Sequence, residues 1–283
     1  MFLIMCYTVV NETQTADRPQ NGGTSAGDPE RKVTKMIETM LTSAMLDVYR
    51  TAACALDRLV YRPLDAHTCA VAGIEGESPI RLSVPDYAPD GRLVTAVDDR
   101  AFSGCASLRT VLLPDAVESV GVRAFAFCTS LLELRIGRNS RLASIGARAF
   151  MGCERLPLVR LGHLTHLTSV GVKAFAYCTG LCSVVLPDSL ETLPEGLFEG
   201  CRRLEHVRLP GRLTVIGASA FSTCTSLGRV TLPESVLCIG EAAFACCDSL
   251  LHIALPVSPC MVAASAFMDC PAAPGECPIP GAV

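Results

Sequence analysis

Cysteine is the residue with the greatest chemical potential in this chain, because sixteen of the 283 residues are cysteines. Thiols at such density can form disulfides, bind metals or act as redox centres. Eight of them, however, each follow a phenylalanine by three residues and recur every 23 or 25 residues. The pairs are Phe102 and Cys105, Phe125 and Cys128, Phe150 and Cys153, Phe175 and Cys178, Phe198 and Cys201, Phe221 and Cys224, Phe244 and Cys247, and Phe267 and Cys270. This recurrence favours packing, since a buried free cysteine behaves as a small hydrophobic residue.

The spacing of the cysteines does not favour zinc or disulfides. No Cys-x-x-Cys motif occurs, and the pair Cys178 and Cys182 has the wrong spacing for a zinc knuckle. In stacked repeats the equivalent thiols project in parallel, which disfavours a disulfide. We therefore predict no metal and no cofactor. A thiol-based redox sensor is a remote alternative, with Cys182 at a strand edge as its candidate.

Two other motifs invite a catalytic interpretation. Residues 23–27 (GTSAG) match the Gly-x-Ser-x-Gly nucleophile elbow, but that serine needs a strand before it and a helix after it. The segment is polar and has no preceding strand pattern, so we interpret the match as chance. His163 and His166 have the spacing of two metal ligands but lack a third ligand at a defined distance. The sequence therefore predicts a protein that is not an enzyme.

Composition excludes further classes of function. The formal charge is −4, aromatic residues make up 5% and tryptophan is absent, which argues against a nucleic-acid partner. The apolar start, residues 1–10, is shorter than a membrane span and lacks the basic region and cleavage site of a secretion signal. We expect no membrane span and a cytoplasmic protein, with a truncated secretion signal as the open alternative.

The elements that position any site divide the chain into five segments. Apolar residues at helical spacing begin after Asp28 and Pro29, an N-cap followed by a proline at the first helical position, and continue to Pro63. This pattern predicts an amphipathic helix that either caps the repeats or docks on a partner. The segments are a disordered tail at 1–30, this helix at 31–63, a linker at 64–79, repeats at 80–270 and a C-terminal tail at 271–283.

One repeat unit reads CASLRTVLLPDAVESVGVRAF (105–125), and the same skeleton returns at 178–198, 201–221 and 224–244. Alternation in Leu108-x-x-Val111-x-Leu113 predicts a short strand with its apolar residues inward, ended by a proline. The phenylalanine side chains are expected to stack as a spine. A glycine four residues before most of them is expected to supply the positive φ of a corner. These glycines are Gly121, Gly146, Gly171, Gly217 and Gly240.

The pattern C-x-x-L-x-x-V-x-L-P-x-x-V-x-x-I-G-x-x-A-F resembles the BspA-like (Treponema pallidum-type) class of leucine-rich repeats, over about eight units of 23–25 residues at 80–270. The resemblance implies a leucine-rich-repeat solenoid of parallel β strands, with turns and short helical segments, here preceded by the N-terminal α-helix. It also implies a protein-binding role, since members include surface adhesins. It names no ligand, because fold does not fix function.

Departures from the repeat are better indicators of function than the repeat itself. Both 25-residue units carry two extra residues after the strand, in 137–141 (GRNSR) and 162–166 (GHLTH), and a glycine replaces the usual proline. Insertions in neighbouring coils are expected to form one bulge, and such insertions often lie on the binding face. Its candidate binding residues are Arg138, Arg141, His163 and His166.

The outward residues of the strands give a second candidate surface. Arg135, Arg160 and Arg208 share one column of the expected sheet, and Glu133 is the one acid among the predicted outward residues. His206, Arg229 and His252 lie close to this column. Guanidinium groups suit carboxylates and phosphates, so this column is interpreted either as a surface for an anionic partner or as a solvated face. A further column, Arg100, Arg123, Arg148 and Lys173, stands two residues before the phenylalanines and is interpreted as a solvated edge.

The sequence thus predicts a non-catalytic protein–protein interaction module with a basic sheet face and a protein partner, which would be acidic if the basic face binds it. The main alternative is a cell-surface or secreted adhesin, which predicts a glycan on Asn11 and oxidised cysteines. The oligomeric state is left open.

Overall fold

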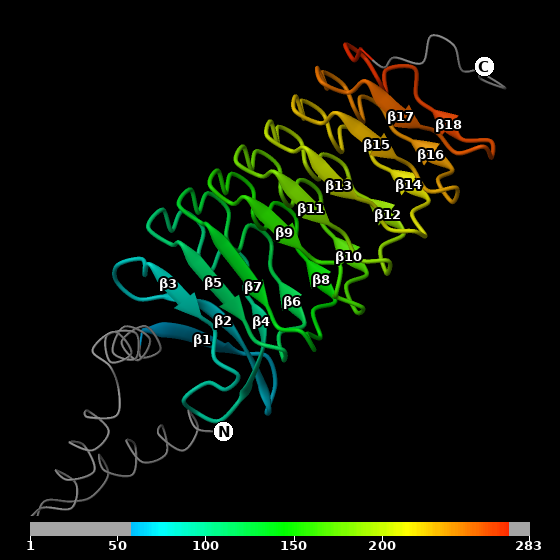
Figure 1. Cartoon of the computed structure of the whole chain (residues 1–283). Coiled ribbons are helices and arrows are strands. Elements are labelled where there is room, and N and C mark those ends of the chain that lie inside the picture. Colours follow the sequence, from blue (N-terminus) through cyan, green and yellow to red (C-terminus); the bar gives the residue numbers. More distant parts are fainter. Residues whose placement is uncertain (1–57, 272–283) are drawn as a thin grey trace, which may run out of the picture. The chain divides into compact units, whose positions relative to one another are not determined.

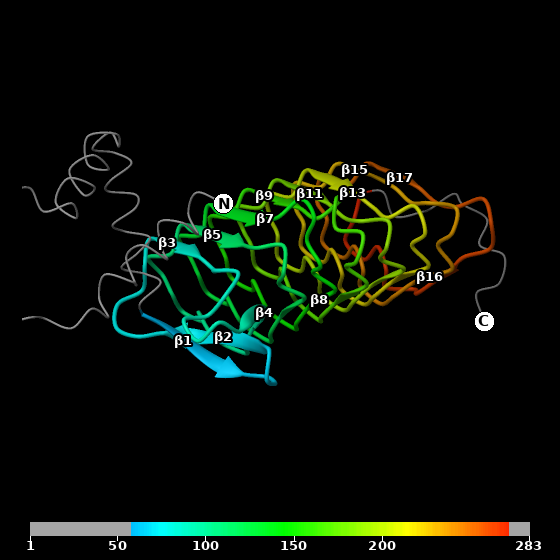
Figure 2. The ribbon, with the colours of Figure 1, turned by 90° about the horizontal axis from the view of Figure 1, so that it is seen from below.

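The computed structural model describes residues 58–271, and over this range the chain forms a parallel-β solenoid (Figure 1). Each repeat makes one coil with a strand on each of two sides and a turn on a third. Figure 2 shows the two sets of strands on opposite sides of the coils. The predicted solenoid is therefore confirmed.

The first set of strands, the main sheet, contains the predicted repeat strands and runs in three hydrogen-bonded sections. The first section is β3 (Arg81–Ser83), β5 (Thr110–Leu113) and β7 (Glu133–Ile136). The second is β9 (Leu158–Arg160), β11 (Ser183–Val185) and β13 (His206–Arg208), and the third is β15 (Arg229–Thr231) and β17 (His252–Ala254). All pairings within these sections are parallel.

The second sheet lies on the opposite side and has two sections. One contains β1 (Leu59–Pro63), β2 (Thr68–Ile74), β4 (Leu93–Val97), β6 (Ser119–Val120), β8 (Ser144–Ile145) and β10 (Ser169–Val170). The other contains β12 (Thr192–Leu193), β14 (Val215–Ile216), β16 (Cys238–Ile239) and β18 (Met261–Val262). Apart from the antiparallel pair β1 and β2, these strands are parallel.

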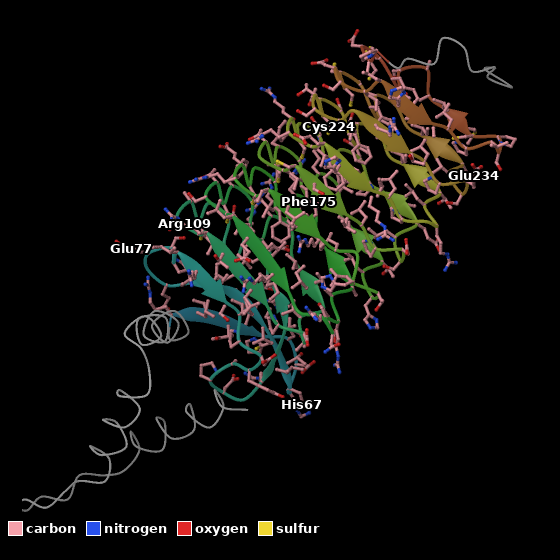
Figure 3. All side chains as sticks on the ribbon, viewed as in Figure 1. His67, Glu77, Arg109, Phe175, Cys224 and Glu234 are labelled. Atoms are coloured by element: carbon pink, nitrogen blue, oxygen red, sulfur yellow. The ribbon has the colours of Figure 1, made fainter. Side chains whose placement is uncertain are left out.

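The phenylalanines form the predicted spine. Neighbouring ring centroids lie 5.2–5.9 Å apart with interplanar angles of 3–24°, in seven successive pairs. Figure 3 shows Phe175 inside the coils, whereas Arg109 lies at the edge. Stacked aromatic pairs contribute roughly 0.5–1.5 kcal/mol beyond the burial of their area. The spine therefore stabilises every junction between coils.

The repeat cysteines pack beside this spine, as predicted. The thiol of Cys201 donates to the carbonyl oxygen of Phe175, one coil earlier, at 3.2 Å, and the same contact recurs from Cys128 to Cys270. Burial raises the pKa of the Cys128 and Cys224 thiols to about 12. A thiol that stays protonated remains a hydrogen-bond donor and is a poor nucleophile.

The expected role of the corner glycines is wrong. Gly121, Gly146 and Gly171 are not among the residues with positive φ; a Cβ on Gly171 would instead lie 2.3 Å from the backbone nitrogen of Ala147 in the preceding coil. The positive φ falls on the basic column, at Arg148 with φ 56° for example. These glycines are required because adjacent coils approach too closely for any side chain.

The turns around the phenylalanines also differ from the short helical segments that the resemblance implied. Within residues 58–271 they are turns and no helix is present. Positive φ recurs two residues before and two residues after most of the phenylalanines, as at Lys173 and Tyr177 around Phe175, and this interrupts any helical run. Across the same described range, we find no helix that could span a bilayer.

The start of the solenoid corrects two sequence predictions. Most of the predicted helix at 31–63 lies outside the described residues, but its end forms strand β1, and the predicted linker at 64–79 contains β2. The two strands pair because Asp65 accepts hydrogen bonds from the N–H groups of His67 and Thr68, which closes a tight turn. Segments 1–30 and 272–283 also lie outside the described residues.

Candidate interaction surface

The strand register places the predicted outward residues of the main sheet side by side. Val185 of β11 lies between Arg160 of β9 and Arg208 of β13, and Ser183 lies between Leu158 and His206. The alternate position is occupied by Val184, which is buried. Alternation therefore turns Arg160, His206 and Arg208 toward solvent, and all three are exposed.

Arg135 is exposed, but its guanidinium group already forms an ion pair with a carboxylate. Its Nε lies 2.6 Å from Oε1 of Glu133, two residues earlier on the same strand and face. The column from Arg135 to Arg160 also crosses a break, because β7 and β9 do not pair. Pro157 explains the break: its equivalents in neighbouring coils, Leu132 and Cys182, donate N–H bonds to the preceding coil, and proline has no N–H.

The two enlarged loops contact each other, as expected for one bulge. Nε2 of His163 lies 3.2 Å from the carbonyl oxygen of Gly137. Buried residues anchor both loops, including Ser140, whose hydroxyl accepts the N–H of Leu142. The predicted binding residues of the bulge are all exposed: Arg138, Arg141, His163 and His166.

A groove of about 960 Å³ lies on the outer face where β13 meets β15. Three predicted residues line it: His206, Arg208 and Arg229. His252 lies outside the groove but pairs with Arg229 across β15 and β17. Glu205 also lines the groove, and the sequence interpretation missed this acid because it precedes the first outward residue of the strand. Its place directly before His206 was the available signal.

The main sheet is open at this groove. Leu186 and Leu232 each donate an N–H bond to the next coil, but their equivalent Leu209 has no such partner in the described chain. Likewise Glu205 and Leu251 donate to the preceding coil, whereas the described residues offer no bond to the N–H of Gly228. Two backbone donors thus lie at the groove without the hydrogen bonds that their equivalents make.

The remaining chemical candidates do not assemble into a centre. Between residues 58 and 271, no cluster of three or more His, Cys, Asp and Glu residues is arranged to hold a metal ion. The thiol of Cys182 donates to the carbonyl oxygen of Gly180 at 3.3 Å.

Comparison with known proteins places this sequence among leucine-rich-repeat proteins. A family model described as BspA type Leucine rich repeat region matches residues 91–165 and 143–273, in six copies. A solved leucine-rich repeat protein of T. pallidum is 29% identical, with a TM-score of 0.48, and the match covers 60% of this chain and 88% of that one. One from Bacteroides ovatus ATCC 8483 is 26% identical over 75% of this chain and 67% of that chain, with a TM-score of 0.48. No curated protein matches the chain.

Proposed function

The chain belongs to the BspA-type leucine-rich-repeat family, and on this premise we propose that it is a non-catalytic module whose main sheet binds an acidic protein segment. Stacked repeats of this kind generally serve as scaffolds, because each coil adds a strip to one extended surface. The proposed mechanism is complementarity between exposed arginines and carboxylates on a preformed surface.

The charge of the main sheet is the observation that supports this proposal. Arg160, Arg208 and Arg229 are exposed, and within the described part of the chain none of them has an ion-pair partner. Other arginines, such as Arg62 and Arg92, are paired with aspartates. An unpaired, exposed guanidinium is available to an acidic partner without first losing an internal contact.

The test uses a defined acidic probe, fluorescein-labelled poly-L-glutamate, followed by fluorescence anisotropy. The double substitution Arg160→Glu with Arg208→Glu is expected to weaken binding at least about tenfold, which corresponds to ~1.4 kcal/mol. The matched control reverses the same number of charges on the turn side, at Arg123 and Arg148. Equal weakening by both variants, or by neither, would reject the main sheet as the binding surface.

The proposed setting is the cytoplasm, with a cell-surface or secreted adhesin as the alternative. Alkylation of freshly isolated protein separates the two, because a cytoplasmic protein should have all sixteen cysteines reactive after denaturation, whereas an oxidising compartment would oxidise at least the half-buried thiols such as Cys182 and Cys246. Glycan on Asn11 would also support the adhesin.

A further inference from the structure

We propose that the groove between β13 and β15 binds a phosphorylated serine or threonine in an extended peptide, with Arg208 and Arg229 holding the phosphate and His206 beside it. This inference rests on the proposed function, since it specifies which acidic group the main sheet recognises. It concerns the groove alone, and not the bulge or the column at Arg135.

The three side chains reach one groove from two strands. His206 and Arg208 are two residues apart on β13, so alternation projects both from the same face. Arg229 is the first residue of β15, on the far side of the groove. All three are exposed and free of ion pairs with any residue in the 58–271 range. Two guanidinium groups can therefore approach a single anion from opposite sides.

The groove is rich in donors, which favours phosphate over carboxylate. Ser183, Ser226 and Thr231 contribute hydroxyl groups to its lining. The N–H groups of Leu209 and Gly228 are the backbone donors left at the open junction. A carboxylate has two acceptor oxygens, whereas a phosphoryl group carries three and nearly twice the charge. The phosphoryl group can therefore use more of this donor set at once.

Glu205 is the acid that lines the groove, and its substitution tests the charge of the ligand independently of the arginines. Its carboxylate is exposed and has no partner in the described coils. It opposes a dianion more strongly than a monoanion, because the repulsion scales with ligand charge. Substitution of Glu205 by glutamine should therefore strengthen phosphate binding more than carboxylate binding.

The experiment measures anisotropy of three fluorescein-labelled alanine–glycine nonapeptides with a central phosphoserine, glutamate or serine. We expect the full chain to bind the phosphoserine peptide at least about tenfold more tightly than the glutamate peptide. Arg208→Gln and Arg229→Gln should each remove this preference. Arg123→Gln, which removes one positive charge from the turn side, should leave it unchanged. Glu205→Gln should raise it, and inorganic phosphate should compete.

Two results would overturn the inference. Equal affinity for the phosphoserine and glutamate peptides, with poly-L-glutamate still bound through the main sheet, would reject the phosphate site and leave the proposed function standing. Failure of both peptides and of poly-L-glutamate would reject both. Arg208→Lys covers the case in which a glutamine variant does not fold: it keeps the charge, and it should still reduce the preference because lysine cannot make the two-pronged contact.

Discussion

The turn side of the coils, which carries the phenylalanines, and the main sheet differ in how regularly they are bonded. On the turn side every coil bonds to the next: the N–H of Phe102 donates to Ala124, that of Phe150 to Ala174 and that of Phe244 to Ala266. The main sheet is interrupted twice, at Pro157 and at the junction of β13 and β15. The continuous side holds the stack together, so the interrupted side is free to vary and carries the distinctive charges and the groove.

The largest effect should come from breaking the continuous side. Phe175→Ala removes a ring that is fully buried and stacked on two neighbours. It should lower the free energy of unfolding by about 3–5 kcal/mol, as for other buried phenylalanines. Urea unfolding followed by circular dichroism gives the value. Phe127→Ala, at an exposed ring, is the control; a similar loss there would mean that stacking in the spine is not the main contribution.

A somewhat smaller effect should follow from separating two coils with one methyl group. Gly171→Ala places a Cβ 2.3 Å from the nitrogen of Ala147 and should cost about 2–3 kcal/mol, because two backbones must move apart. Gly211→Ala is the matched control on the other side of the coils, since the nearest atom to its Cβ lies 3.7 Å away. Both are measured by thermal unfolding, and equal losses would contradict the close-approach explanation.

The contrast between the turn side and the main sheet explains which features could be predicted from the sequence. The regular side follows from residue type at fixed spacing, so the Phe175 spine, the burial of Cys201 and the inward position of Val184 were predictable. Pro157 also carried a readable signal, since proline cannot donate to a sheet. The opening beside Gly228 was not predictable, because it depends on backbone geometry and not on side-chain chemistry. The strand Leu59–Pro63 was missed because its apolar residues continue the helical spacing that precedes it.

Alkaline pH should lower the free energy of unfolding through the buried thiols that pack beside the phenylalanines. Burial raises the pKa of Cys224 from the ordinary 9.0 to about 12, so the folded state disfavours the thiolate. Below pH 9 the thiol is protonated in both states and its contribution is fully present. Between pH 9 and pH 12 the unfolded chain releases the proton first, and stability falls by about 1.4 kcal/mol per pH unit for this group.

The measurement is urea unfolding at pH 8 and pH 10, compared with Cys224→Ala. The alanine variant should start less stable and lose less on going to pH 10. Val184→Ala, at a buried residue that does not titrate, should lower stability at both pH values and keep the wild-type dependence on pH. The same slope for wild type and Cys224→Ala would show that the buried thiols do not set the alkaline limit.

The smallest effect should come from the exposed edge of the turn side, where Tyr177 has positive φ and its ring lies against Gly200 of the next coil. Its hydroxyl donates to Oε1 of Glu199 at 2.6 Å, and Nζ of Lys173 lies 3.0 Å from Oε2 of the same carboxylate.

Tyr177→Phe keeps the ring and removes one hydrogen bond, so it should cost about 0.5–1 kcal/mol. Tyr177→Gly removes the ring but relieves the positive φ, which glycine adopts without strain. Because the ring covers Gly200 of the next coil, we expect the glycine variant to be the less stable of the two in chemical unfolding. The reverse order would mean that the aromatic side chain at this turn serves a purpose other than holding adjacent coils together.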